Sequence, residues 1–530
     1  MKLERLHEYI LITVVILLGI AFALFAGSKV GAGQPKTVVM VLTALTLVLL
    51  AAKYNRKLWI LIPLTTGFTG FVAGIPGGFL PFKDLVGVYV FGTFLALKAL
   101  KIVRQKPIQD ALDVLLILNL IYLASVLMRN PVGSLGIDSE RIGGRPYFQI
   151  AAAYLAYLVL GWTTVSPHLA YKLPVWMVGG SLFEGFAGFI GDKVPWLGEK
   201  LTQFYTSFAT LTMQGFVENS DNLTEGDRLT YLAPAGSTIA KTLVSYFTPS
   251  ALINPLYFGR FLLLLLSVLF IFLSGYRSAF FDMLLVFAIA SYFRSGMKQV
   301  AIGVFLTVPI LAFLIIGQGV LFDLPLNTQR TLSFLPGHWS GEAKEAADGS
   351  LNWRVEMWKD VFFTDHYIHD KLLGDGFGIN RREWEAVQLA KLSGFSLRLE
   401  AEEQAIMGTF HNGPLSTLRV VGYVGSVLYI LLIFYTAYKA FLLTKRTKDT
   451  PFFPLTLLTT VPTIIVPFLF LIGGGFYDID LERTIYAIGM IKLITRSFNE
   501  YEALELNKNR PGQADRASLQ DLRPRLSFAG

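Results

Sequence analysis

The chain has 530 residues, of which 53% are hydrophobic and only 16% are charged, and this balance excludes an ordinary soluble protein. The formal net charge of +8 does not indicate a nucleic-acid partner, because the lysines and arginines lie mostly in short clusters beside apolar runs, as membrane topology signals do. There is no cysteine, which excludes disulfides, thiolate catalysis and cysteine-bound metals.

Long apolar stretches recur along the chain and predict membrane-spanning helices, since a bilayer core needs about 20 apolar residues per helix. A membrane β-barrel would need short alternating segments instead. We therefore predict an all-α integral membrane protein with about 12–14 transmembrane helices. Twelve clear stretches and two weaker ones are, in chain order, 9–26, 37–52, 58–73, 85–102, 111–127, 148–164, 174–190, 238–247 (weak), 257–273, 279–293, 300–317, 420–443, 452–472 and 484–494 (weak).

The basic residues also predict topology, because lysine and arginine in short loops favour the cytoplasm. Clusters at 53–57 and 98–106 place the ends of the second and fourth spans inside. The basic clusters after two later spans fall inside only if the chain crosses once more near 233–247. We therefore predict a crossing there, broken at Pro234 and Gly236.

This count divides the chain into four parts. Residues 1–318 and 416–498 are transmembrane helical regions, and residues 319–415 form a long loop on the outer side. Residues 499–530 are polar and mixed in charge, which predicts a disordered cytoplasmic tail. Loops beyond about 15 residues are uncommon unless they are functional or disordered, and the aromatic and charged content of the long loop favours function.

Two motifs precede the end of this loop. Trp353, Met357 and Trp358 recur at helical spacing and predict an amphipathic helix on the membrane surface. Residues 374–378 form a glycine turn that lets the backbone approach a ligand or a neighbouring helix closely. Packing is the commoner reason for such a turn.

His411 and Asn412 directly precede the apolar stretch at 420–443. A histidine at the outer mouth of a helical bundle suits proton transfer near neutral pH, since its ordinary pKa is about 6.5. The simpler interpretation is that His411 caps the helix. His366 and His369 have a spacing that suits metal ligands, but no further ligand at a recognisable distance supports a metal site.

Four arginines fall on the outer side in this topology: Arg228, Arg277, Arg330 and Arg354. Arg277 lies between two apolar spans, where a charge is expensive and usually has a partner. The planar guanidinium matches phosphate with two hydrogen bonds, so converging arginines would suit a lipid pyrophosphate. The alternative for any one of them is an arginine that reaches lipid headgroups. Asp478 and Asp480 have the spacing of a cation-binding pair on a sugar phosphate, but this spacing is common by chance, and a solvated turn is the preferred explanation beside Glu482 and Arg483.

The order of these motifs resembles the O-antigen ligase and polymerase superfamily of bacterial membrane glycosyltransferases. The resemblance covers roughly residues 228–443. It rests on residues 274–278 between two spans, Trp353, Arg354 and Trp358 in the loop, the glycine turn, His411 with Asn412, and then Gly422 with Gly425 in the next span.

The resemblance implies an activity and its residues. A glycan would move from an undecaprenyl-pyrophosphate carrier to a hydroxyl of a lipid A core or a growing polysaccharide, on the periplasmic face of the bacterial inner membrane. His411 matches the loop histidine that activates or orients the acceptor, and Arg277 and Arg228 match pyrophosphate-binding arginines. Arg354 resembles the loop arginine. Arg330, Trp358 and Asn412 are further substrate-binding candidates.

The chemistry implied needs no metal and no cofactor, because fixed arginines can stabilise the departing pyrophosphate and in-line attack would invert the anomeric centre. Tyr276 stands where a small serine is more usual, and Gly413–Pro414 stand where a bulkier pair is common, which leaves the acceptor open. The motif set looks closer to the ligase branch, and a polymerase of the same superfamily is the alternative. From other classes, a secondary transporter and a structural assembly protein also remain.

Overall fold

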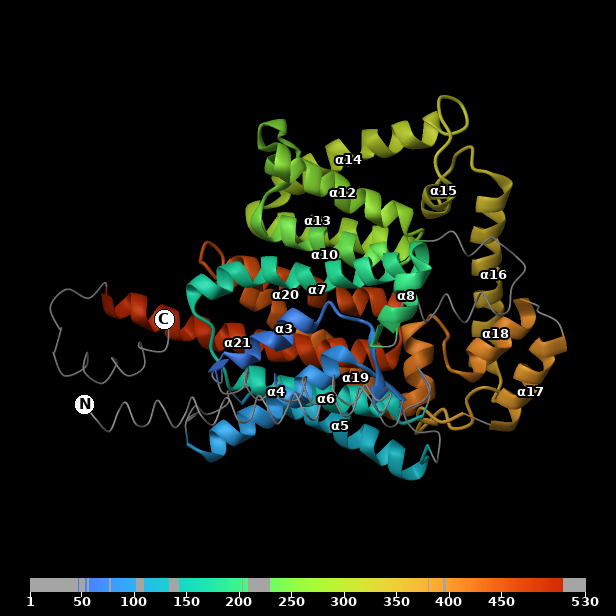
Figure 1. The fold of residues 1–530 in the computed structure, drawn as a ribbon, viewed down its shortest axis with the longest axis horizontal. Helices are drawn as coiled ribbons and strands as arrows, with labels where there is room; N and C mark the ends of the chain where they lie inside the picture. The colour runs from blue at the N-terminus through green and yellow to red at the C-terminus, as the bar shows by residue number, and fades with distance from the viewer. Residues whose placement is uncertain are drawn as a thin grey trace, which may run out of the picture. The chain divides into compact units, whose positions relative to one another are not determined.

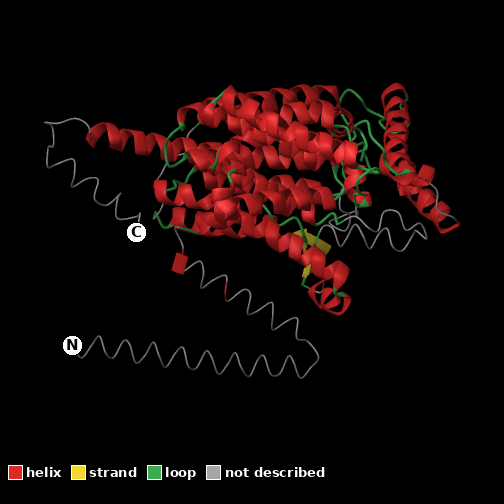
Figure 2. Cartoon of the chain, turned by 90° about the horizontal axis from the view of Figure 1, so that it is seen from above, coloured by secondary structure: helices red, strands yellow, loops and turns green. Residues whose placement is uncertain are grey.

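The computed structural model describes residues 46, 53–54, 57–75, 78–101, 109–132, 143–202, 204–207, 229–379, 381–393 and 397–508. The chain forms two compact units, residues 1–60 with 93–103, and residues 61–92 with 104–530. In the first unit, the described elements are the short helix η1 (Leu58–Ile60) and the end of α4 (Phe82–Ala99). All other elements belong to the second unit, which is mostly helical (Figure 2).

In the second unit, short α3 and a β-hairpin come first, and helices of different lengths and the short strand β3 follow. Figure 1 labels most of these helices. The first part contains α3 (Leu61–Thr65), β1 (Phe71–Ile75), β2 (Gly78–Pro81), the start of α4, α5 (Ala111–Arg129), α6 (Arg145–Gly161), α7 (Pro167–Lys193), α8 (Pro195–Thr202) and β3 (Tyr205–Thr206). The second part contains α10 (Leu232–Tyr246), α11 (Pro249–Ile253), η2 (Pro255–Tyr257), α12 (Phe258–Leu273), α13 (Arg277–Ser295), α14 (Met297–Gly317), α15 (Leu326–Leu332), α16 (Gly341–Phe363), α17 (Arg381–Ser393), α18 (Leu397–Ile406), α19 (Gly413–Arg446), α20 (Phe453–Phe468), η3 (Leu469–Gly473) and α21 (Tyr477–Lys508).

Six helices in the described part are long and apolar enough to cross a membrane. They are α5, α7, α13, α14, α19 and α20 with its continuation to Ile472. Each overlaps a stretch that the sequence predicts as a span, so a mostly helical, multi-pass membrane protein is the fold. The larger number of 12–14 crossings stays a prediction, and the stretch at 9–26 lies outside the described residues.

Residues 58–73 do not form the continuous span that the sequence predicts. The helix ends at Thr65, and β1 follows, paired antiparallel with β2 on one side and β3 on the other. Glycine explains the difference, because a Cβ at Gly70 would lie 2.5 Å from the Thr206 carbonyl oxygen. Only a residue without a side chain lets these strands approach so closely.

The weak stretch near 233–247 forms α10, which packs against α7, α12 and α13. Its polar residues face partners inside the bundle. Lys241 pairs with Asp282 of α13 at 2.7 Å, and the Ser267 hydroxyl donates to the Gly236 carbonyl at 2.9 Å. The predicted break is wrong, since α10 runs without interruption and Pro234 sits in its first turn, where proline is tolerated. That α10 crosses the bilayer stays a prediction.

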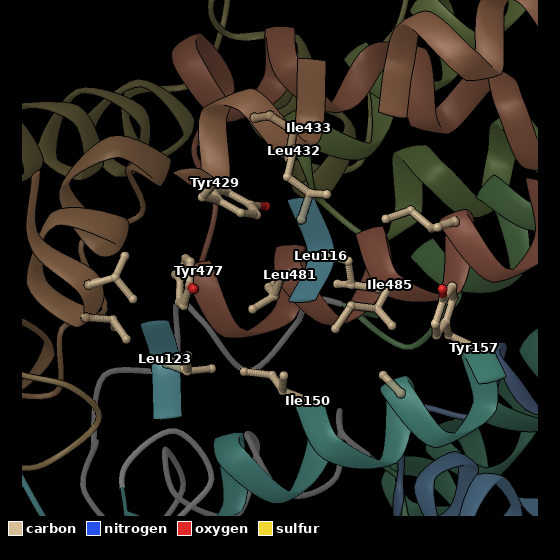
Figure 3. Packing of buried hydrophobic residues seen from close by; sticks show 14 of the residues in the cluster. Leu116, Leu123, Ile150, Tyr157, Tyr429, Leu432, Ile433, Tyr477, Leu481 and Ile485 are labelled. Carbon is tan, nitrogen blue, oxygen red and sulfur yellow. The ribbon is translucent and has the colours of Figure 1, made fainter. Parts of the chain in front are cut away.

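The main apolar core joins α5, α6, α19 and α21 (Figure 3). Leu116 and Ile150 meet Tyr429 and Leu432 of α19, and Leu481 and Ile485 of α21 complete the contact. The alternation of large apolar residues at helical spacing produces this interface. The core fixes α19 and α21, the two helices whose first turns frame the candidate site.

The long loop of residues 319–415 is itself helical, with α15, α16, α17 and α18 drawn in gold and orange in Figure 1. The predicted amphipathic helix is part of α16. Its place on the outer face stays a prediction. At the other boundary, α21 continues through Asn499 to Lys508, ten residues into the segment predicted as a tail, and residues 509–530 lie outside the described part.

Candidate functional site

The turn at residues 408–412 joins α18 to α19 and carries His411. Its backbone is unusual, because His411 has a φ of 49° and Gly408 a φ of 72°. A positive φ is uncommon for a residue with a side chain and costs free energy unless the surroundings impose it. Such strained backbone persists only where the surrounding structure imposes it, and it is common at functional sites.

Neighbouring elements hold the His411 ring on two sides. Its Nε2 lies 3.2 Å from Oε1 of Gln404, on α18. The ring meets Phe476 edge to face, with centroids 5.2 Å apart. His411 is half-buried, so the imidazole is oriented by protein contacts and still meets solvent. That combination suits a group that accepts or donates a proton.

The residues beside His411 fix the turn to α16 and α19. Asn412 caps α19, and its Oδ1 accepts from the Leu415 amide at 3.1 Å. Phe410 is fully buried, and its carbonyl accepts from Trp358 Nε1 at 2.6 Å. The capping role therefore belongs to Asn412, and the Trp358 indole positions the turn through the Phe410 backbone.

The glycine turn at 374–378 docks on a break in α19. Gly422 has φ 63° and ψ −172° inside this helix, which releases backbone groups that a continuous helix would bond. The Asp375 and Gly376 amides donate to the carbonyls of Arg419 and Val420, at 2.8 and 3.0 Å. Close backbone packing, the commoner reason for such a turn, is what the structure shows.

Arg419 is a buried residue of this region that the sequence analysis did not single out. It is 6% exposed, and its Nη2 donates to the Gly378 carbonyl at 3.0 Å. Its guanidinium also lies against Gly408, where an added Cβ would come within 2.2 Å of Nη1. Arg419 thus connects the glycine turn to the His411 turn. An arginine within a long apolar helix is the signal that identifies such a residue.

The predicted arginines fall into two groups. Arg354 lies on α16 one turn before Trp358, so it shares the helix face that meets the His411 turn. Arg277 begins α13, directly after the tight turn at Gly275, and the buried Arg330 lies on α15, which contacts α13. Helix α16 contacts both α15 and α19 and so connects the two groups.

Arg228 lies outside the described residues. The other predicted site residues are all described: His411, Asn412, Trp358 and Arg354 gather around α16, α18 and α19, whereas Arg277 and Arg330 gather around α13 and α15.

The loop between α20 and α21 is a second part of the site that sequence reasoning undervalued. A Cβ on Gly474 would lie 2.7 Å from the His411 carbonyl oxygen, and one on Gly475 would lie 2.3 Å from Asp480 Oδ2. Asp480 accepts from the Phe476 amide at 3.0 Å. The sequence favours a solvated turn for Asp480, but its side chain is only 17% exposed and lies beside the His411 turn.

Asp480 lies in the first turn of α21, outside the six apolar helices. Burial raises the pKa of Asp480 to about 6, although Arg483 opposes the shift. Its carboxylate therefore titrates in the same range as an ordinary histidine.

In the part of the chain that the structure describes, no group of three or more His, Asp or Glu side chains is placed to hold a metal ion. The His369 amide instead donates to Asp375 Oδ2 at 2.8 Å, which stabilises the loop before the glycine turn. The His369 ring nitrogen Nδ1 also lies 3.6 Å from the same oxygen.

No protein-family model and no curated protein matches the chain.

Proposed function

We propose that the chain is a membrane glycosyltransferase that moves a glycan from an undecaprenyl-pyrophosphate carrier to an acceptor hydroxyl. The observation that carries the proposal is the His411 turn. A strained, half-buried histidine at the start of an apolar helix is held by Gln404 and Phe476, and an arginine-bearing helix packs against the same turn.

The proposed reaction is one displacement. The acceptor oxygen attacks the anomeric carbon, the bond from that carbon to the pyrophosphate oxygen breaks, and the acceptor proton passes to His411. Arg277, Arg354 and Arg330 stabilise the charge that develops on the leaving pyrophosphate. Gln404 orients the imidazole, and positioning lowers the entropic cost of bringing donor and acceptor together. In-line attack inverts the anomeric centre.

The proposal includes a place for the reaction. Residues 319–415 form the periplasmic part, the helices cross the bacterial inner membrane, and the donor lipid enters from the bilayer. The proposal allows two acceptors, a lipid A core, as for a ligase, or a growing polysaccharide, as for a polymerase. Offering both to the purified protein with one lipid-linked oligosaccharide distinguishes the two enzymes.

The first test replaces His411 and Arg277 by alanine in protein reconstituted with lipid-linked oligosaccharide. We expect His411→Ala to lower the transfer rate by about 10²–10⁴-fold, the usual loss for a removed general base, and Arg277→Ala to abolish transfer. His366→Ala is the matched control, because His366 is an exposed histidine of the same loop. Full activity in either test variant, with the protein inserted, removes that residue from the mechanism.

A secondary transporter is the second candidate. The Lys241–Asp282 ion pair between α10 and α13 favours it, since charges inside a helical bundle often mark ion or substrate pathways. Uptake into proteoliposomes that contain no lipid-linked sugar would support transport, and transfer without uptake would support the glycosyltransferase.

A further inference from the structure

A second group of ionisable side chains lies apart from the His411 turn, where α4 meets α21. Lys83 and Asp84 are in the first turn of α4, and Glu482 is in the second turn of α21. Lys83 Nζ lies 2.5 Å from Glu482 Oε1. Asp84 is 0% exposed and Glu482 is 3% exposed. Two buried carboxyl groups therefore lie beside one half-buried ammonium.

Asp84 is the unusual member of this group. Neither of its carboxyl oxygens has a hydrogen-bond partner among the described residues. The charges that act on it are those of Glu482 and Lys83. An ionised carboxylate that is buried without hydrogen bonds costs several kcal/mol, so such a group takes up a proton instead.

Arg145 of α6 is also buried, but its guanidinium lies over the Phe71 ring, 4.7 Å from the centroid, and it is not among the charges that act on Asp84. One turn further along α4, a Cβ at Gly87 would lie 3.5 Å from the Ala152 carbonyl oxygen of α6 and 3.8 Å from the Tyr486 hydroxyl. Tyr486 is the remaining titratable group of α21 close to Asp84 and Glu482. Arg483 is 71% exposed and faces Asp480 at 3.8 Å, so it compensates Asp84 little.

Charge counting decides the state of the group. With both carboxylates ionised, the sum with Lys83 is +1 − 2 = −1, and this charge would be enclosed between α4, α6 and α21. One bound proton brings the sum to zero. It also turns the Asp84 carboxyl into a hydrogen-bond donor.

We propose that Asp84 and Glu482 hold one proton between them, with Lys83 neutralising the remaining carboxylate, so that this junction is a proton-binding site. The site is separate from the proposed glycosyl transfer. Glu482 lies two residues after Asp480, about 200° around α21, so the two carboxyl groups face different sides of the helix. Loss of the proton leaves an uncompensated charge that weakens the contact between the first turn of α4 and α21.

Infrared difference spectroscopy of the purified full chain in nanodiscs tests the proposal, because a protonated carboxylic acid has a C=O band separate from that of a carboxylate. We expect this band at pH 7 in the parent protein, its loss in Asp84→Asn, and its shift in Glu482→Gln. Asp365→Asn is the control, since the Asp365 side chain is 81% exposed, and it should keep the band.

Three outcomes would overturn the proposal. The first is a band that is identical in Asp84→Asn and the parent. The second is a band that disappears when Na⁺ replaces K⁺ at constant pH, which would mean that the site takes a metal cation. The third is a marked loss of thermal stability, or of folding, in Asp84→Asn at pH 7, because a neutral isostere of a protonated acid should leave stability unchanged.

Discussion

At the α20–α21 junction, burial changes the pKa of one side chain, Asp480. The Asp480 carboxyl is only 17% exposed and is held by the Phe476 amide, beside the strained His411 turn. Its pKa is raised to about 6 by burial. His411 itself does not cap α19, because Asn412 fills that role, so the strain at His411 needs another reason, which the proposed acceptor activation supplies.

The raised pKa of Asp480 predicts a pH-dependent stability. An acid with a higher pKa in the folded state binds more protons when folded, so its contribution is full below its ordinary pKa of 3.8 and is lost as the pH rises through about 6. We expect the parent to lose about 2 kcal/mol of folding stability between pH 4 and pH 7 through this carboxyl group. Asp480→Asn, which cannot titrate, should lack that part of the loss. Thermal unfolding in detergent across this range measures it, and parallel curves for the two proteins would contradict it.

Among the elements, α19 carries most of the site because it is broken at Gly422. The break releases backbone groups, and residues 371–376 bond them: the Tyr423 amide donates to the Lys371 carbonyl at 2.8 Å, and the Gly376 amide donates to the Val420 carbonyl. Irregular backbone inside a membrane helix is tolerated only where such partners exist. The loop and the helix therefore stabilise each other, and this contact positions the segment that precedes α17.

Replacing Gly422 by alanine should separate the loop from α19. Its φ of 63° with ψ of −172° is a region used almost only by glycine, and the new Cβ would lie 2.4 Å from the Leu372 carbonyl oxygen. We expect a loss of about 3 kcal/mol or more, with increased proteolysis at residues 371–378.

Gly259→Ala in α12 is the matched control. A Cβ there has no atom within 4 Å, and alanine favours a helix over glycine by up to about 1 kcal/mol. Equal stability of Gly422→Ala and the control would show that the break in α19 is not held by the loop.

At the scale of the whole molecule, α10 decides which loops share a face. The chain passes from α7 through α10 to α12, and these three helices pack side by side. If α10 crosses the membrane, the turn at Gly275 and residues 319–415 lie on the same side, and the junction at Asn254 lies on the other.

Reporter fusions test this topology directly. We expect a fusion at Asn254 to report a cytoplasmic location and a fusion at Gly275 to report the opposite side. The reason is the basic residues that follow α13 and α19, which favour the cytoplasm. An extracytoplasmic reporter at Asn254 would remove the α10 crossing and place the Gly275 turn away from the proposed active face.

The sequence by itself determined the fold class and most of the long helices, because lipid requires about 20 consecutive apolar residues and helical periodicity is readable along the chain. It also singled out His411, Asn412 and Trp358, since unusual polar and aromatic residues at the start of an apolar stretch are visible without a structure. Charge placement, not hydropathy, predicts a crossing at α10, since its lysine lowers the hydropathy of the stretch. The structure shows a helix there, with this lysine paired to Asp282, and the crossing itself stays a prediction.

Only the tertiary structure decided the rest. The strand pairing at 71–75 replaces a predicted span because glycines permit close contact with β3, and apolar content alone does not distinguish a short strand from a helix. Gln404, Phe476 and Asp480 come to His411 from segments that pattern reasoning treats separately. Asp84 and Glu482 are almost 400 residues apart in the chain, and both are buried at one place only because the first turn of α4 lies beside α21. Long-range proximity of this kind depends on which helix faces meet, and the sequence pattern of one helix does not contain its partner.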